Sequence, residues 1–249
     1  MCARRAGHAA ARGENEGIAT LQPPTMPNAA PRTVVITGAA GALGQAVAAE
    51  LGPGNNLVLI NRHLAEAPHG VLSLAADVTS DTAMAHAASL IARRFGSVEM
   101  LVHTAGGFEM GEPVNELSRA TWDRLMDLNA WSFVTVTKHL VPLIRGGSGG
   151  SIVAVSAASA AAGDAYKGAY AASKAALQRL VESQAAELRG EGIRVNSVAP
   201  TVLDTPANRA AMPDADPAGW TPLPDAARAI AFLLSDAGRA VTGRHVVLG

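Results

Sequence analysis

The sequence has almost no cysteine, no long apolar run and almost no net charge, and each absence excludes a class of protein. Its one cysteine, Cys2, excludes a disulfide framework or a cysteine-based metal site within the chain and fits a reducing, cytoplasmic location. No apolar run reaches the roughly 18 residues of a membrane span. A net charge of −1 offers no basic surface to nucleic acid or an anionic membrane. We therefore expect a small-molecule partner.

Aromatic residues are also scarce, at 4% of the chain, whereas hydrophobic residues make up 49% and there are 25 glycines. The core is therefore built from Ala, Val, Leu and Ile, which is typical of helices packed on a parallel sheet. The histidines, His103 and His139 among them, include no pair with the spacing of a metal site. We expect structural histidines and no metal.

The first 30 residues differ in composition from the rest. They are rich in Ala, Gly and Arg and lack the apolar core of a secretory signal, and Glu14 and Glu16 argue against a transit peptide. We interpret residues 1–30 as a disordered leader, with Met26 as the functional first residue, and residues 31–249 as one domain. No internal repeat or second domain is visible.

Short β-branched runs alternate with helical periodicity along the domain. Seven runs are predicted as strands: Thr33–Thr37, Asn56–Ile60, Val71–Val78, Val98–Gly107, Ser151–Ser156, Gly192–Pro200 and Arg244–Leu248. The longer predicted helices are Thr79–Phe95 (with Thr79 or Ser80 as N-cap), Ser118–Ile144, Gly168–Arg189 and Ala226–Ser235. This alternation predicts an α/β fold, a doubly wound parallel seven-stranded sheet with helices on both faces. A polar, Pro-rich segment, residues 201–224, interrupts it.

A glycine-rich turn joins the first predicted strand to a helix. Gly38, Gly41 and Gly44 allow a tight turn and let a pyrophosphate approach the N–H groups at the start of the helix. The alternative is an ordinary strand-to-helix turn. Three glycines in seven positions at this place favour a dinucleotide site.

The end of the second strand normally meets the adenosine ribose of a dinucleotide. The stretch from Leu57 to Ala65 contains no acid, and Arg62 is available for a 2′-phosphate, which favours NADP over NAD. Arg62 as a solvated loop cation is the alternative. Asp77, followed by Val78, is a candidate partner for the adenine amino group.

The stretch Ala105-Gly106 removes side chains at the exit of the fourth strand, where a cofactor would lie flat. Tyr170 and Lys174 are four residues apart and share one face of a predicted helix. The ammonium should lower the pKa of the phenol and make it a proton donor and acceptor near neutral pH. A surface tyrosine over a solvated lysine is the alternative. Asn129, in mid-helix, is either solvent-facing or functional.

Several stretches resemble, in order and spacing, the short-chain dehydrogenase/reductase family. These are TGAAGALG (Thr37–Gly44), Asp77-Val78, TAG (Thr104–Gly106), Asn129, YAASK (Tyr170–Lys174) and IRVNSVAP (Ile193–Pro200). The resemblance covers about residues 32 to 249. It implies a Rossmann-type domain, a nicotinamide cofactor, and hydride transfer with Tyr170 as acid and base. It further implies that Lys174 lowers the pKa of Tyr170 and holds the nicotinamide ribose, and that Asn129 orders a proton-relay water. The expected cofactor contacts are completed by Leu43, Pro200 and Val202.

The sequence departs from the family pattern at three places. Ala42 breaks the family's commonest glycine pattern, and Gly41 supplies the middle glycine instead. His103-Thr104 stands where the family has asparagines. The catalytic serine, about thirteen residues before the tyrosine, is replaced by Ala157. Ser156 is one residue early and would point elsewhere on a strand, and Ser159 is two residues late.

These departures resemble one subfamily, the quinonoid dihydropteridine reductases. The shared features are GALG after the first strand, the Ala105–Phe108 turn, Ala157 and, above all, the long irregular segment Thr201–Leu223. A quinonoid dihydropterin spreads charge over several heteroatoms, so Tyr170 alone could suffice as donor. Phe108 and Trp220 could supply flat apolar faces for a fused ring, with core or loop packing as the alternative. Arg62 departs from this subfamily's usual acid.

Two other functions remain open from the sequence. One is an ordinary carbonyl reductase or alcohol dehydrogenase in which Ser156 or Ser159 replaces the missing serine. The other is a cofactor-binding protein with little turnover. The Ala-rich faces of residues 118–144 and 168–189 suit close helix contact, and the resemblance implies a homodimer or homotetramer.

Overall fold

The strands of the computed structural model form one parallel sheet in the order β3-β2-β1-β4-β5-β6-β9. The structure describes residues 31–63, 68–147 and 149–249, which belong to one compact unit, Pro31–Gly249. Its strands are β1 Thr33–Thr37, β2 Asn56–Asn61, β3 Leu72–Ala75, β4 Met100–His103, β5 Gly150–Val155, β6 Ile193–Pro200 and β9 His245–Leu248. The predicted doubly wound seven-stranded parallel sheet is confirmed. The leader predicted for residues 1–30 lies outside the described residues.

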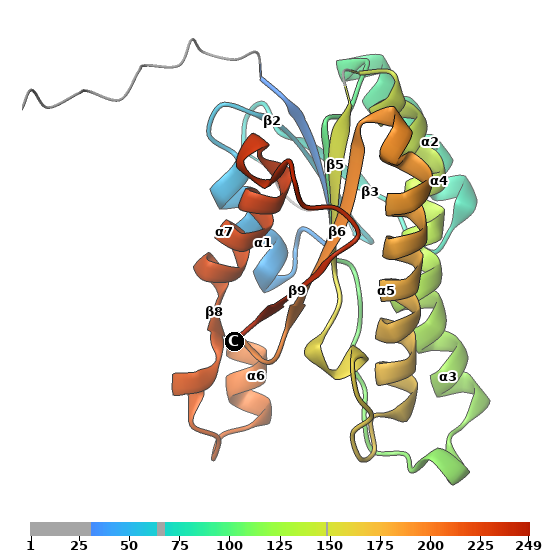
Figure 1. Cartoon of the computed structure of the whole chain (residues 1–249), viewed down its shortest axis with the longest axis vertical. Helices are drawn as coiled ribbons and strands as arrows, with labels where there is room; N and C mark the ends of the chain where they lie inside the picture. The colour runs from blue at the N-terminus through green and yellow to red at the C-terminus, as the bar shows by residue number, and fades with distance from the viewer. Residues whose placement is uncertain (1–30, 64–67, 148) are drawn as a thin grey trace, which may run out of the picture. The chain divides into compact units, whose positions relative to one another are not determined.

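Helices cover both faces of this sheet, as Figure 1 shows. On one face lie α1 (Ala42–Leu51) and α7 (Leu223–Leu234). On the other lie α2 (Asp81–Phe95), α4 (Ser132–Arg145) and α5 (Gly168–Leu188), with α3 (Arg119–Met126) preceding α4. Each layer buries its own apolar cluster against the sheet.

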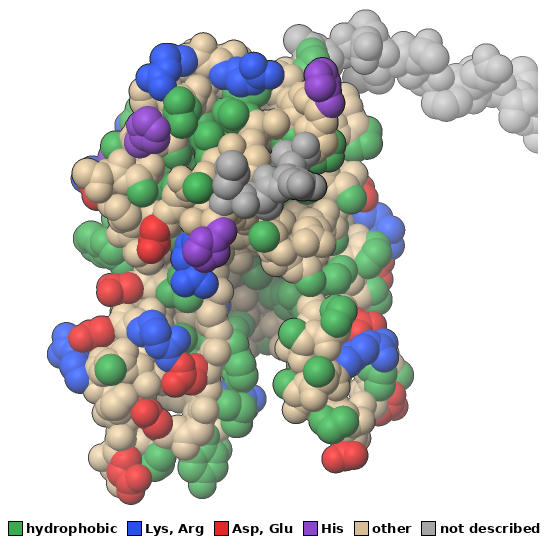
Figure 2. All heavy atoms as spheres, turned by 180° about the vertical axis from the view of Figure 1, so that it is seen from behind, with side chains coloured by type: hydrophobic (Ala, Val, Ile, Leu, Met, Phe, Trp, Pro, Cys, Tyr) green, Lys and Arg blue, Asp and Glu red, His purple; other side chains and the backbone are tan. Residues whose placement is uncertain are grey.

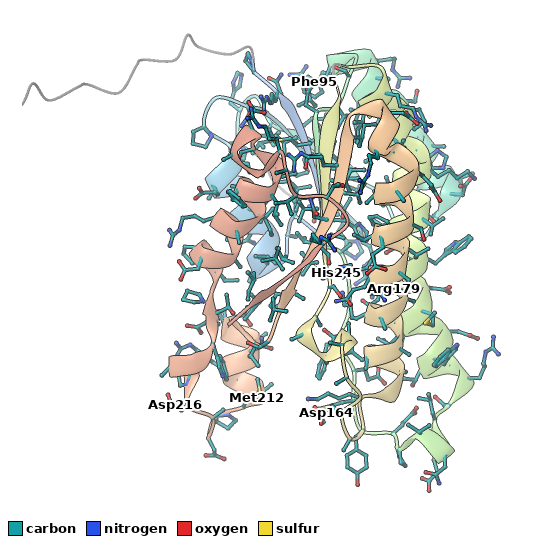
Figure 3. The ribbon with its side chains drawn as sticks, in the orientation of Figure 1. Phe95, Asp164, Arg179, Met212, Asp216 and His245 are labelled. Atoms are coloured by element: carbon teal, nitrogen blue, oxygen red, sulfur yellow. The ribbon has the colours of Figure 1, made fainter. Side chains whose placement is uncertain are left out.

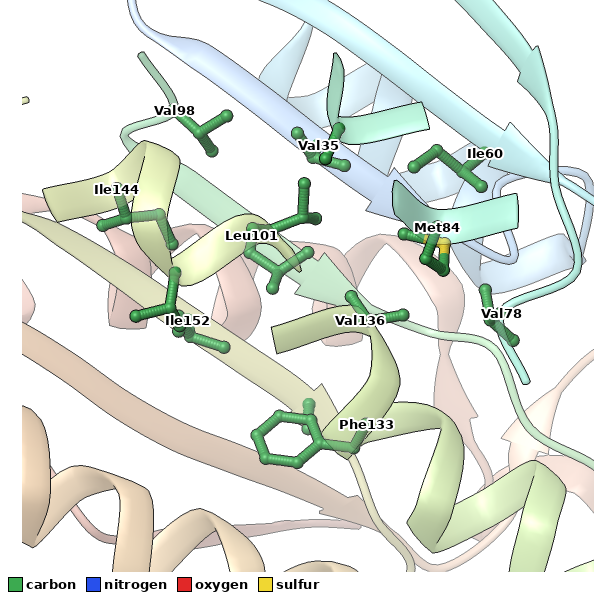
Figure 4. Close-up of a cluster of buried hydrophobic side chains, with 14 of the residues drawn as sticks. Val35, Ile60, Val78, Met84, Val98, Leu101, Phe133, Val136, Ile144 and Ile152 are labelled. Carbon is green, nitrogen blue, oxygen red and sulfur yellow. The ribbon is translucent and has the colours of Figure 1, made fainter. Parts of the chain in front are cut away.

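The larger cluster lies between the sheet and helices α2, α4 and α5. Strand residues such as Val35 and Leu101 meet Met84 of α2 and Phe133 of α4 (Figure 4). Because valine, leucine and isoleucine fill most of this layer, the sheet can be covered closely with few aromatic rings.

The two ends of helix α2 carry the residue types by which the sequence predicted them. The Ser80 hydroxyl accepts a hydrogen bond from the Ala83 N–H at 3.3 Å and caps the helix, as one of the two predicted N-caps. Asp81 stands in the first turn, and Arg93 and Arg94 stand in the last, where their charges complement the helix dipole. No helix in the described ranges is long and apolar enough to cross a bilayer.

The predicted helix over residues 118–144 differs in one respect. It is divided into α3, a π-helical turn η2 (Asp127–Trp131) and α4. The Ser132 N–H donates to the Asp127 carbonyl five residues earlier, which inserts one extra residue into the helix. Periodicity alone did not reveal this turn, on which Asn129 lies.

The Pro-rich segment after β6 has structure of its own. It contains β7 (Leu203–Asp204), α6 (Pro206–Ala211) and β8 (Thr221–Pro222), with β7 and β8 paired in a separate two-stranded sheet. Short 3-10 turns complete the connections: η1 Val114–Glu116, η3 Ala158–Ala160, η4 Arg189–Glu191, η5 Pro217–Gly219 and η6 Asp236–Gly238.

Candidate active site

The strand order reverses its direction of growth between β1 and β4, and a crevice is expected at their carboxyl ends. Gly38 follows β1 with a φ of +67°, a conformation that favours glycine. A Cβ at Gly38 would lie 2.7 Å from the Ala105 nitrogen and 2.9 Å from Thr104 Oγ1. The two strand exits therefore approach so closely that a side chain at this position is excluded.

Helix α1 begins directly behind this turn with its first N–H groups available. Its N-cap, Gly41, has no side chain to accept from them. A Cβ at Gly44 would lie 2.4 Å from the Gly38 carbonyl oxygen, so the helix packs directly on the turn. Leu43 turns its side chain into the core. A pyrophosphate is the kind of anion that fits such an uncapped helix start.

Thr104 explains one departure from the family pattern. Its hydroxyl donates to the Thr37 carbonyl at 2.7 Å, with the Gly38 carbonyl at 3.2 Å. The threonine thus ties the exit of β4 to the glycine turn.

At the adenosine end, the structure adds a residue that the sequence interpretation missed. Asn61, the last residue of β2, accepts a hydrogen bond from the Ala40 N–H at 2.6 Å through its side-chain oxygen. Asn61 stands at the strand end, for which the sequence analysis considers only carboxylates and Arg62. Its position as the residue directly before Arg62 was the available signal.

Asp77 and Arg62 lie within electrostatic range of each other. The pKa of Asp77 is lowered chiefly by hydrogen bonds from the Thr79 N–H and hydroxyl, with a smaller contribution from the charge of Arg62. Arg62 and Asp77 are both exposed, whereas the neighbouring Val78 is buried. The predicted adenosine contacts are therefore brought to one edge of the sheet.

Tyr170 and Lys174 lie one turn apart on α5, but their electrostatics differ from the prediction. Burial raises the pKa of Tyr170 to about 12, so the prediction of a lowered value is wrong for the protein without cofactor. Burial likewise lowers the pKa of Lys174 to about 8. The Lys174 ammonium donates to the Val155 carbonyl at 2.9 Å. Desolvation by burial is the cause of both shifts.

Asn129 is buried and fully engaged, which decides between the two sequence alternatives against a solvent-facing residue. Its amide oxygen accepts from the Gly107 N–H at 2.8 Å, and its amide nitrogen donates to the Gly107 carbonyl and to Ser173 Oγ, both at 2.9 Å. A Cβ at Gly106 would lie 2.9 Å from Asn129 Oδ1 and 3.1 Å from Lys174 Nζ. These three residues therefore meet at one point, where the cofactor was expected to lie flat.

The missing serine is not replaced by its neighbour. Ser156 is buried and its hydroxyl donates to the Lys174 carbonyl at 3.3 Å, so it serves the backbone of α5. Ala157 is also buried and precedes the turn η3, which carries the half-buried Ser159. Replacement by Ser159 stays a prediction.

The two aromatic residues predicted for a fused ring are treated differently by the fold. Phe108 packs edge-on against the Tyr170 ring, with 4.9 Å between ring centroids, and is 59% exposed. Trp220 is half-buried at the end of η5, and the described residues give it no ring contact with Phe108 or Tyr170. The structure thus places Phe108, and not Trp220, against the catalytic candidate.

Pro200 and Val202 stand where the sheet passes into the substrate segment. Pro200 ends β6, and the Val202 carbonyl accepts from the Thr221 N–H at 2.8 Å. The segment forms one of two lobes at the carboxyl end of the sheet, and Figure 2 shows the surface hollowed between them. In Figure 3 Met212 and Asp216 mark this lobe and Asp164, in the β5–α5 connection, marks the other.

The opposite lobe carries the loop after β4 and the connection before α5. The Gly111 N–H donates to the Tyr166 carbonyl at 2.9 Å and joins the two. Tyr166 itself has a φ of 62°, an uncommon and strained conformation for a bulky residue. Phe108, Met110 and Val114 of the first loop are exposed apolar side chains at the mouth of the site.

In the described ranges, no group of three or more His, Cys, Asp or Glu could hold a metal ion. His139 pairs with Asp81 at 3.0 Å on the surface, and His103 is buried.

Comparison with known proteins identifies the family of the chain. A family model described as enoyl-(acyl carrier protein) reductase matches residues 38–248. The cis-4-hydroxycyclohexanecarboxylate dehydrogenase of Sinomonas cyclohexanicum is 35% identical over 232 residues, covering 86% of this chain and 93% of that protein. The D-threitol dehydrogenase of Mycolicibacterium smegmatis is 30% identical, covering 87% and 91%. The ligand-free aldohexose dehydrogenase of Thermoplasma acidophilum superposes with a TM-score of 0.80 at 25% identity, covering 88% and 92%.

Because Lys174 is buried, we expect its contribution to the free energy of unfolding to rise with pH. Its pKa is about 8 in the folded protein against 10.5 for an ordinary lysine, so between these values the unfolded chain binds more protons. The free energy of unfolding of the wild type, relative to a Lys174→Met variant, should therefore rise with pH across this window, by at most about 3 kcal/mol. Denaturant unfolding of both proteins from pH 7 to about 10 measures the difference. A difference that does not change with pH would contradict the lowered pKa.

Proposed function

The chain belongs to the short-chain dehydrogenase/reductase family of oxidoreductases, and we propose that it reduces a ring substrate with a nicotinamide cofactor. The observation that carries this proposal is the Tyr170 ring packed edge-on against Phe108, in a chain that has Ala157 where the family has a serine. The residues present fit the cofactor: the turn at Gly38 has no room for a side chain, helix α1 begins uncapped, and Gly106 brings the backbone close to Lys174 and Asn129. The bound nicotinamide would supply the hydride.

The protein's own groups would then supply the proton and the geometry. With a pKa of about 12, Tyr170 keeps its proton at neutral pH and is a donor ready for the reductive direction. Lys174 lies one turn away, with an ammonium that donates to the Val155 carbonyl, and it would hold a ribose hydroxyl of the bound cofactor. Asn129 holds the Gly107 backbone in place.

Our first candidate substrate is a quinonoid dihydropterin or a similar conjugated ring. An acceptor that spreads charge over several heteroatoms needs fewer donors at one oxygen, and here Ser156 is turned to a backbone carbonyl and Ala157 has no hydroxyl. The exposed Phe108 offers an apolar face to a flat ring. The reaction consumes one hydride and one proton per ring and yields the tetrahydropterin.

The second candidate is a ketone or secondary alcohol on a saturated ring. It is favoured by the relative that acts on cis-4-hydroxycyclohexanecarboxylate. In this case Ser159 would have to supply the second donor.

The two candidates differ in their response to a restored hydroxyl. For the first, the wild type should reduce quinonoid dihydropterin well and 4-oxocyclohexanecarboxylate poorly, and Ala157→Ser should raise ring-ketone reduction by up to about 100-fold because it adds an oxyanion donor. Steady-state oxidation of NADPH and NADH with both substrates measures this. Preferred ketone reduction that Ala157→Ser leaves unchanged and Ser159→Ala abolishes would establish the second candidate instead.

Loss of the Tyr170 hydroxyl separates an enzyme from a cofactor-binding protein. Tyr170→Phe keeps the ring against Phe108 but removes the proton donor, so turnover should fall by about 100- to 10,000-fold while cofactor affinity is unchanged. Tyr166→Phe is the matched control: these are the chain's 2 tyrosines, and within the described residues the Tyr166 hydroxyl makes no hydrogen bond. Turnover equal to wild type in Tyr170→Phe would contradict the proposed role.

We further propose that the cofactor is NADPH, with Asn61 and Arg62 at its 2′-phosphate. An Arg62→Ala variant should bind NADPH about tenfold or more weakly, because it loses one charged hydrogen bond. Its affinity for NADH should change little. Asn61→Asp should shift the preference to NADH because a carboxylate repels the phosphate. Fluorescence titration of both cofactors measures this, with Arg239→Ala, at the opposite edge of the sheet, as control. Equal affinity of the wild type for the two cofactors would refute the argument.

A homodimer or homotetramer in a reducing cytoplasm completes the proposal. A groove of about 440 Å³ along η2, α4 and α5 is lined by apolar residues that include Val134, Leu180 and the 58% exposed Trp131, together with Asp127, Arg179 and Ser183. A second copy of the chain, packed through the same face, would cover it.

A further inference from the structure

One buried titratable side chain has no part in the proposed chemistry. His103 ends β4 and is 0% exposed, between the end of β1 and the start of α4. Its ring meets Phe133 edge-on, with 5.8 Å between centroids, and each of its two nitrogens has a partner. A buried imidazole with both nitrogens engaged holds its neighbours in one arrangement.

The Leu128 carbonyl can only accept a hydrogen bond, and this determines the direction of each hydrogen bond that leads to it. Ser132 Oγ lies 2.7 Å from the Leu128 carbonyl, to which it can only donate. It therefore accepts from His103 Nε2 at 3.1 Å, and His103 Nδ1 in turn accepts from the Thr37 hydroxyl at 2.9 Å. One neutral tautomer satisfies all three groups. Burial, assisted by the nearby charge of Lys174, lowers the pKa of His103 to about 3 and keeps the ring neutral.

These contacts act on the π turn that carries Asn129. In a regular α-helix the Ser132 N–H would donate to the Leu128 carbonyl, but here it donates to Asp127 instead. The Ser132 hydroxyl takes the vacated place on Leu128. The side chain of Ser132 thus bonds the carbonyl to which its own N–H would donate in a regular α-helix, and His103 is hydrogen-bonded to that side chain.

We propose that His103 is a positioning residue, which through Ser132 stabilises the π turn and so keeps the Asn129 amide on Gly107 and Ser173. Thr37, its other partner, directly precedes the glycine turn at Gly38. One ring therefore joins the cofactor turn to the helix that presents Asn129. This inference rests on the proposed function, since turnover is one of its two measurements.

Two substitutions separate the contact with Ser132 from the contact with Thr37. The amide of His103→Asn ends near the place of Nδ1, where it can accept from Thr37 but cannot reach Ser132. The longer amide of His103→Gln can reach both. We expect kcat to fall by about 10- to 100-fold in His103→Asn, with KM and cofactor affinity within about threefold of wild type, and we expect His103→Gln to retain most of the wild-type kcat.

Combined variants test the path through Ser132. Ser132→Ala should lower kcat as His103→Asn does, and the two together should cost no more than either alone. In an Asn129→Ala background, His103→Asn should not lower the residual turnover further. The matched control is His139→Asn, which should keep the wild-type kcat. His139 lies on α4, like Ser132, but pairs with Asp81 at the surface.

A second measurement does not depend on turnover. Hydrogen exchange of the peptide covering residues 127–133 should be about tenfold or more faster in His103→Asn than in His103→Gln, because the π turn opens more readily. Equal exchange in the two variants overturns the proposal even if no substrate is turned over by the wild type. Equal losses of kcat in the two variants, or losses that add to that of Asn129→Ala, would also overturn it and assign His103 a general role in the core.

Discussion

The close approach of the backbone at the ends of β1 and β4 is the constraint on which the rest of the site depends. With no room for a Cβ at Gly38, the glycine turn lies directly against Thr104 and Ala105. Thr104 ties the two exits together with its hydroxyl, and helix α1 packs on the same turn through Gly44. The same small residues bring the backbone together at the carboxyl ends of β1 and β4, where a flat cofactor is expected to bind.

Burial sets the protonation of Tyr170 and Lys174, the proposed catalytic pair. Removing Tyr170 and Lys174 from water raises the pKa of one and lowers that of the other, so both are driven toward their neutral forms. A lysine held on a backbone carbonyl and a protonated phenol form a resting state suited to proton donation. A positive charge brought by an oxidised nicotinamide would favour the phenolate, and this links proton transfer to the redox state of the cofactor.

Around this pair, polar side chains that could have bound a substrate instead form hydrogen bonds within the protein and hold the backbone. Ser156 serves α5, Asn129 holds Gly107, and His103 and Ser132 hold the π turn. The side chain left to donate beside Phe108 is that of Tyr170. A phenol donor beside an apolar ring is the arrangement on which the proposed delocalised ring substrate rests.

The sequence by itself determined the seven-stranded parallel sheet with helices on both faces and the glycine turn after β1. Alternating strand and helix signals are local, and the glycines of the first turn and the Tyr170–Lys174 spacing carry their meaning wherever the helix packs. Tertiary structure alone decided the π turn at Asn129, because an inserted helical residue leaves the apolar period almost unchanged. It also decided the pKa of Tyr170, which depends on how much water the fold removes, and the roles of Asn61, Ser156 and His103, whose partners lie 18 or more residues away. Spacing shows which residues can share a face, and only packing shows which of them are left free to act.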